Sequence, residues 1–232
     1  LVSVMFANNE NGAIQDIKQL KAGVRAEMSL IHTDAVQALG KIPVDFDDLG
    51  VDLMSLSSHK IYGPKGCGAL IVKTASNIKP LLLGGGQENG WRAGTENVAA
   101  IVGFGKAAEL ARLELDQRSE HCLKLRRELE YSLNKIPELV IFSEQVERLP
   151  NTVQFAIKGI DGEMLLMQLD QKNIAVSSGS ACASSGGEPS SVLMAMGVDH
   201  HLAKGAVRVS FGKDNTEEEV AEFIKVLKEI VI

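Results

Sequence analysis

Short apolar runs that end abruptly in polar residues recur in the first part of the chain. Residues 1–7, 30–37 and 51–56 each contain such a run, and the polar residues at its end include turn formers. Residues 14–28 alternate apolar and charged positions at helical spacing, which predicts a crossover helix between the first two runs. A strand, a helix and a strand in this order predict a parallel pair. The pattern therefore predicts an α/β fold with a mostly parallel sheet.

The middle of the chain predicts one more strand and a long helical stretch. Residues 68–73 are almost wholly apolar, which predicts a strand buried on both faces. Helical spacing then extends from Val98 to about Leu133, first among small apolar residues and afterwards among charged ones. The change of composition near Gln117 predicts a large domain over residues 1–116 and a small domain over residues 117–232.

The predicted small domain interleaves strands with helices, which suggests a smaller α/β domain. Its last helix has the clearest signals, since Thr216 and Glu219 form a capping box ahead of an apolar stripe. Such a stripe packs into a core in most cases. The stripe consists of Val220, Phe223, Ile224, Leu227 and Val231, and the other expected elements are strands near 139–142, 152–157 and 174–177 and a helix over 162–171.

Composition excludes several classes of protein. The 232 residues carry a net charge of −6 without a run of like charges, so binding to nucleic acid through a basic face is not expected. No apolar stretch approaches the roughly 20 residues of a membrane span. The three cysteines include no close pair, and no histidine pair has the spacing of a zinc site, so neither a disulfide framework nor a metal site is predicted. A reducing, cytoplasmic setting follows most simply.

The run at 51–56 delivers a lysine to the end of a strand. Ser57, Ser58, His59 and Lys60 follow it directly, and Gly63 then forces a turn. Open α/β sheets bind their ligands at the carboxyl ends of strands, so Lys60 is a candidate Schiff-base lysine for pyridoxal phosphate. Asp34, at the end of another run, is a candidate for the anion that keeps the cofactor's pyridine nitrogen protonated. The competing interpretation of Lys60 is a solvated loop residue.

A cysteine with unusual neighbours is the second candidate for chemistry. Cys182 lies among serines, glycines and alanines in residues 177–187, a stretch almost without side chains that anchor a core. Structural cysteines usually lie among large apolar residues, so this pattern predicts a thiol on a mobile loop. A thiol on a flexible, polar arm can move between a pocket and the surface.

Three segments, residues 32–37, 57–66 and 177–182, together closely resemble the cysteine desulfurases of the NifS and IscS group. The resemblance extends from Leu1 to the terminal helix. It implies a class V aminotransferase-like, pyridoxal phosphate-dependent enzyme of the aspartate aminotransferase type (fold type I), with part of a large domain and a smaller α/β carboxyl-terminal domain. Family members have a long amino-terminal portion before the position of Asn8, so the sequence looks like the carboxyl-terminal part of such an enzyme.

The resemblance also implies roles for individual residues. Lys60 and Cys182 would be catalytic, Asn9 and Arg208 would bind the substrate carboxylate, and Cys182 would meet metal only in transient iron–sulfur transfer. The substrate would be L-cysteine, the product L-alanine, and the sulfur would leave as a persulfide on Cys182 for an iron–sulfur scaffold protein. A homodimer is implied, in which Thr95 touches the phosphate of the partner's cofactor. The implied cofactor-binding residues are Lys60, Asp34, Gln37, Asn9, Ser57, His59 and Thr95.

Alternatives remain open from the sequence. Arg208 would otherwise be a surface arginine on an edge strand. A selenocysteine lyase or related aminotransferase would use the same lysine without needing Cys182. An inactive fragment or subunit that acts only as a binding partner is the alternative from a different class, because the segment that supplies the family's phosphate-binding loop does not occur in these 232 residues.

Overall fold

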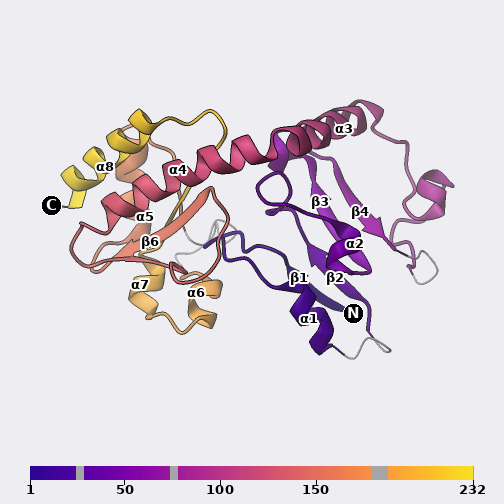
Figure 1. Cartoon of the computed structure of the whole chain (residues 1–232), viewed down its shortest axis with the longest axis horizontal. Helices are drawn as coiled ribbons and strands as arrows, with labels where there is room; N and C mark the ends of the chain where they lie inside the picture. The colour runs from indigo at the N-terminus through magenta and orange to yellow at the C-terminus, as the bar shows by residue number, and fades with distance from the viewer. Residues whose placement is uncertain (25–28, 74–77, 179–187, 232) are drawn as a thin grey trace. The chain divides into compact units, whose positions relative to one another are not determined.

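The computed structural model describes residues 1–24, 29–73, 78–178 and 188–231, and the chain divides into two compact units (Figure 1). Unit 1 comprises Leu1–Phe6 and Gln15–Leu115. Unit 2 comprises Ala7–Ile14 and Asp116–Ile232. Each unit contains a four-stranded sheet. A short segment near the start of the chain thus packs with the carboxyl-terminal unit, which no local sequence pattern predicts.

The sheet of unit 1 is mostly parallel, as predicted. Its order is β1-β2-β3-β4, with the first three strands parallel and the last one antiparallel to β3. The predicted crossover helix is present as α1 (Ile17–Gly23), which begins where the Asp16 side chain accepts a hydrogen bond from the Gln19 backbone. The remaining elements here are β1 (Val2–Met5), β2 (Ile31–Asp34), α2 (Phe46–Leu49), β3 (Leu53–Ser57) and β4 (Gly68–Val72).

The strand β4 differs from its prediction. Burial on both faces was expected, but Leu70 is 50% exposed and Ile71 is 36% exposed. The prediction was wrong because β4 is one of the two edge strands of this four-stranded sheet, and an apolar run alone does not distinguish an edge strand from a central one.

A short turn and a long helix complete unit 1. The 3₁₀ helix η1 (Ser58–Ile61) follows β3 directly and packs against α3 (Val98–Leu113). Ile61 makes this contact, since it is 2% exposed and clusters with Ala107 and Ala111 of α3. A second 3₁₀ helix, η3 (Gln87–Gly90), lies in the long connection before α3.

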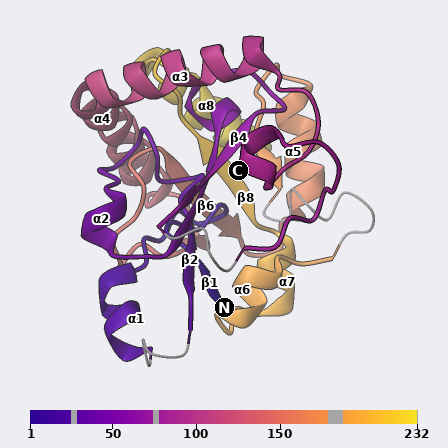
Figure 2. The same cartoon turned by 90° about the vertical axis from the view of Figure 1, so that its right-hand side faces the viewer.

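Unit 2 is built on an antiparallel sheet in the order β5-β6-β8-β7. Three helices that supply the larger core pack on one face, and two short helices pack on the other, where Figure 2 shows them side by side. The strands are β5 (Leu139–Ile141), β6 (Thr152–Ile157), β7 (Ser177–Ser178) and β8 (Val207–Ser210). The helices are α4 (Leu115–Leu133), α5 (Gly162–Asp170) and α8 (Glu217–Val231) on the first face, and α6 (Ser191–Ala195) and α7 (His200–Lys204) on the second.

The predicted apolar stripe of the last helix is confirmed as core. Val220, Phe223 and Leu227 are buried in the cluster between α8, α4 and β6. The capping box is also confirmed, because the Glu219 backbone donates to the Thr216 hydroxyl and the Glu219 carboxylate accepts from the Thr216 backbone. Hydrogen bonds from the Asn215 side chain and the Thr216 backbone hold the pKa of Glu219 below its ordinary value.

Phe155 provides a test of this core. Its side chain is fully buried on β6 and meets Phe223 edge to face, with ring centroids 6.4 Å apart. Replacing Phe155 by alanine is expected to lower the free energy of unfolding by about 3–5 kcal/mol, because the lost apolar contacts leave a cavity. Urea denaturation followed by circular dichroism measures the change. The exposed Met164 is the matched control, and Met164→Ala should alter stability by no more than about 0.5 kcal/mol.

Candidate active site

Asp34 is the last residue of β2, and local hydrogen bonding fixes its side chain. Its Oδ1 accepts a hydrogen bond of 2.9 Å from the Val36 backbone N–H, which turns the chain sharply at the end of the strand. Gln37 lies in the same turn and accepts a hydrogen bond of 3.0 Å from Lys41 Nζ. Asp34 and Gln37, which are two of the predicted cofactor-binding residues, are half-buried and belong to one turn.

Lys60 projects from a turn whose geometry is closely defined. The turn closes through backbone hydrogen bonds from Gly63 N to Ser58 O (3.0 Å) and from Ser58 N to Cys67 O (3.1 Å). Ile61 is buried against α3, whereas Lys60 is exposed, so the lysine amine points away from the core. Gly63 is required here, because an added Cβ would lie 2.2 Å from Ser58 Oγ.

The hydroxyl and imidazole beside this lysine contact each other. Ser57, the last residue of β3, shares a hydrogen bond of 2.8 Å between its Oγ and His59 Nδ1. Parallel pairing aligns Asp34 with Ser55, two residues before the end of β3. The carboxylate of Asp34 and the turn that carries Lys60 therefore lie on the same side of the sheet, at the carboxyl ends of the strands. Folds of this kind bind their ligands there.

The predicted substrate-binding residues, Asn9 and Arg208, meet in unit 2. Arg208 lies on β8, and its Nη1 donates a hydrogen bond of 2.7 Å to the backbone carbonyl of Asn9. Asn9 lies in a turn in which Asn8 Oδ1 accepts hydrogen bonds from the backbones of Glu10 and Asn11. β8 pairs with β6 and β7 on either side, so Arg208 does not lie on an edge strand.

Of the two remaining predicted residues, the structure describes only Thr95. Thr95 is exposed in the connection between η3 and α3. Cys182 lies outside the residues that the structure describes. Sequence reasoning missed Glu10, a carboxylate that is buried in unit 2 although it follows two predicted turn formers. Its partners are distant in the sequence, so no local pattern signals its burial.

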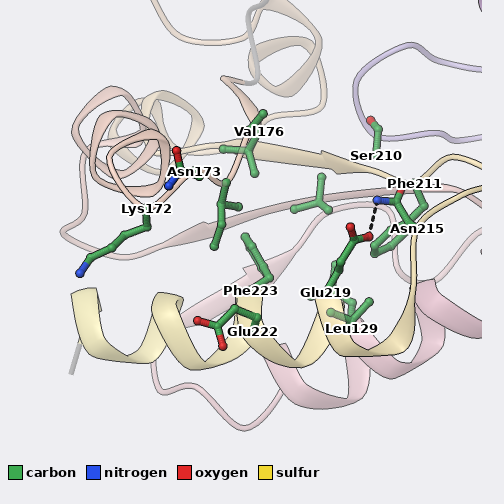
Figure 3. A pocket seen from close by; sticks show the side chains of 14 residues that line it. Leu129, Lys172, Asn173, Val176, Ser210, Phe211, Asn215, Glu219, Glu222 and Phe223 are labelled. Atoms are coloured by element: carbon green, nitrogen blue, oxygen red, sulfur yellow. Dashed lines mark hydrogen bonds between the residues drawn. The ribbon is translucent and has the colours of Figure 1, made fainter.

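Unit 2 also contains a cavity of about 400 Å³ beside α8 (Figure 3). Its lining includes the apolar residues Val176, Val209 and Phe223 and the charged residues Lys172 and Glu222. Its volume is within the range of small-molecule sites. Neither Asn9 nor Arg208, the predicted site residues that the structure describes in unit 2, is among the residues that line this cavity.

Within residues 1–24, 29–73, 78–178 and 188–231, no group of three or more His, Cys, Asp or Glu side chains is placed to hold a metal ion. Over the same part of the chain, no helix combines the length and apolar character that crossing a membrane would require.

The donor chemistry of unit 1 fits pyridoxal phosphate. The exposed amine of Lys60 suits the cofactor's aldehyde, and the carboxylate of Asp34 suits its protonated pyridine nitrogen. The hydroxyl of Ser57 and the imidazole of His59 suit its phosphate. A mostly parallel sheet with an amine and a carboxylate at the carboxyl ends of its strands is typical of a fold-type I enzyme.

Comparison with known proteins agrees with this class. The family model for class-V aminotransferases matches residues 1–223. The chain belongs to the class-V aminotransferase family.

Within the family, the similarity points to one group. The chain is 48% identical over its whole length to cysteine desulfurase IscS of Methanosarcina thermophila and 47% identical to cysteine desulfurase IscS of Clostridium botulinum. The solved structure of a NifS-like protein from Rickettsia africae superposes with a TM-score of 0.91 at 39% identity, covering 99% of this chain and 61% of that one. The chain spans 57% of the length of the Methanosarcina protein and 59% of the Clostridium protein.

Proposed function

We propose that the protein containing this chain is an L-cysteine desulfurase, which converts L-cysteine to L-alanine and retains the sulfur as a persulfide on Cys182. The observation that carries the proposal is the carboxyl edge of the unit 1 sheet, where Asp34 and the turn bearing Lys60 lie together in a chain 48% identical to a cysteine desulfurase. This pair of groups has the chemistry that pyridoxal phosphate needs.

Each residue has a role that follows from its chemistry. Asp34, Gln37, Ser57 and His59 would hold the cofactor, and Lys60 would bind its aldehyde. When bound, pyridoxal phosphate supplies an electron sink for the charge that forms at the substrate's α carbon. Once the substrate's amine has replaced it on the aldehyde, the freed amine of Lys60 would take the proton from that carbon, since an amine beside the reacting atom can act as a general base. Arg208 and Asn9 would orient the substrate carboxylate.

The sulfur step needs the thiolate of Cys182. Its sulfur attacks the sulfur of the substrate, so that a sulfur–sulfur bond forms while the carbon–sulfur bond breaks. The electron pair of the broken bond returns to the carbon side, which is protonated to give alanine. Free cysteine has a pKa of about 8.5, so the reaction depends on a site that favours the thiolate.

The proposal extends to partners and setting. The persulfide would pass its sulfur to an iron–sulfur scaffold protein in the cytoplasm. The protein would act as a homodimer, in which the exposed Thr95 reaches the phosphate of the partner's cofactor. Exposed apolar side chains close by, including Leu81 (92% exposed) and Leu83 (81%), support a contact with another chain in this region.

Peptide mass mapping tests the function. The intact protein is incubated with L-cysteine and digested without reductant, and the peptide that contains Cys182 is expected to gain the mass of one sulfur atom. Alanine should appear in equal amount. The persulfide would be absent from every cysteine peptide if the protein were a simple aminotransferase.

A further inference from the structure

Glu10 is a buried carboxylate outside the roles described above. It is 9% exposed, and its Oε2 accepts hydrogen bonds from Ser190 Oγ and, at 3.4 Å, from Gln154 Nε2. These two partners are themselves buried, at 1% and 0% exposure. Removing a carboxylate from water costs free energy unless hydrogen-bond partners compensate for it. Two buried side chains serve as such partners here, so we ask what the buried carboxylate contributes to the structure.

The backbone on which Glu10 sits is fixed from two sides. Arg208 Nη1 donates to the carbonyl of Asn9 at 2.7 Å, and the N–H of Glu10 donates to Asn8 Oδ1 at 2.8 Å. This carbonyl and this N–H belong to the same planar peptide group. The side chain of Glu10 is a third point of attachment, because it anchors the same residue to Gln154 on β6 and to Ser190 at the start of α6.

The sheet connects these contacts to Arg208. Gln154 is the cross-strand partner of Arg208, and side chains opposite each other in a pair lie on the same face. The Asn9–Glu10 peptide group is thus held next to the guanidinium by one residue of β6 and by the N-cap residue of α6. The carbonyl of this peptide group accepts a hydrogen bond from one N–H of the guanidinium. Because the guanidinium is planar, this bond limits the directions in which its other N–H groups can point.

We propose that Glu10 is a positioning residue, which fixes the Asn9–Glu10 peptide group and thereby orients the Arg208 guanidinium toward the carboxylate of the substrate. The inference rests on the proposed function, in which Arg208 binds that carboxylate. Glu10 acts through Arg208 and has no contact of its own with the substrate in this scheme.

The hydrogen bonds of Glu10 suggest a precise pair of variants. Both partners donate to the same oxygen, Oε2. A glutamine has a carbonyl oxygen that can accept both bonds, whereas an alanine can accept neither. Glu10→Gln should therefore preserve the position of the peptide group, and Glu10→Ala should release it.

Two amines that differ only by a carboxylate provide the readout. L-alanine, the product, and ethylamine are titrated into the intact, cofactor-loaded protein, and the absorbance of the cofactor reports the dissociation constant of each. Glu10→Ala is expected to weaken L-alanine binding about tenfold, the order of effect of one charge-assisted hydrogen bond, and to leave ethylamine binding unchanged. Glu10→Gln should keep L-alanine binding within about threefold of the original.

Further variants separate the possible failures. Ser190→Gly removes the hydroxyl donor while glycine still serves as an N-cap, so L-alanine binding should weaken selectively here too. Glu138→Gln, at an exposed ion pair with Lys158, is the control that should bind both ligands normally. If Arg208→Gln leaves L-alanine binding unchanged, the proposed role of Arg208 is wrong. If Arg208→Gln weakens it while Glu10→Ala does not, or if Glu10→Ala weakens both ligands equally, the positioning role is overturned.

Discussion

Replacing Lys60 by alanine is expected to abolish the covalent attachment of pyridoxal phosphate and to lower the rate of alanine formation by about 10³-fold or more. Lys60 projects from the closed turn after β3 with its amine exposed, and the adjacent residue Ile61 is buried against α3. The substitution removes a side chain that has no part in the core. The turn should persist, and the loss should be one of chemistry and not of folding.

Borohydride reduction measures the attachment directly. In the original protein the reduced cofactor should be recovered on the peptide that contains Lys60, and Lys60→Arg should yield none, because a guanidinium keeps the charge but does not form the bond. The matched control is Lys106→Ala, since Lys106 is an exposed lysine of α3 that pairs with Glu109 on the surface. Cofactor found on a different lysine in the original protein would refute the assignment of Lys60.

The positions of Lys60 and Asp34 at the carboxyl ends of strands could be predicted, because the sequence pattern that marks the end of a strand is local. An apolar run of strand length that stops at a polar residue predicts both the strand and its end, and parallel pairing follows from the crossover helix between strands. That helix was predicted only between the first two strands, and the structure shows that β2 and β3 are parallel as well, which brings their carboxyl ends to the same side of the sheet. The apolar stripe of α8 is a local signal of the same kind.

The surroundings of β4 and Glu10 could not be predicted, because they depend on distant partners. An apolar run such as 68–72 looks the same whether its faces are covered or open, and here Leu70 is half exposed. Glu10 follows Asn8 and Asn9 like any polar residue of a turn. Its burial depends on Gln154 and Ser190, which lie 144 and 180 residues away in the sequence.

Replacing Cys182 by serine is expected to lower the formation of alanine from L-cysteine by about 10²-fold or more while Lys60 still binds the cofactor. A serine hydroxyl at neutral pH is a poor nucleophile toward sulfur, whereas a thiolate accepts sulfur readily. The two substitutions should therefore fail differently. Lys60→Ala should lose the cofactor bond, and Cys182→Ser should keep that bond but should form no persulfide.

Measuring alanine and persulfide together distinguishes the competing functions. Cys122→Ala is the matched control, because Cys122 is buried on α4 among core side chains and its thiol should not be needed for turnover. A selenocysteine lyase or an aminotransferase would retain its turnover in Cys182→Ser, since neither needs a thiol to accept sulfur. A binding subunit without activity would show no turnover in any variant, including the original protein. Only a desulfurase loses alanine and persulfide together when Cys182 is replaced, because the two products arise in the same bond exchange.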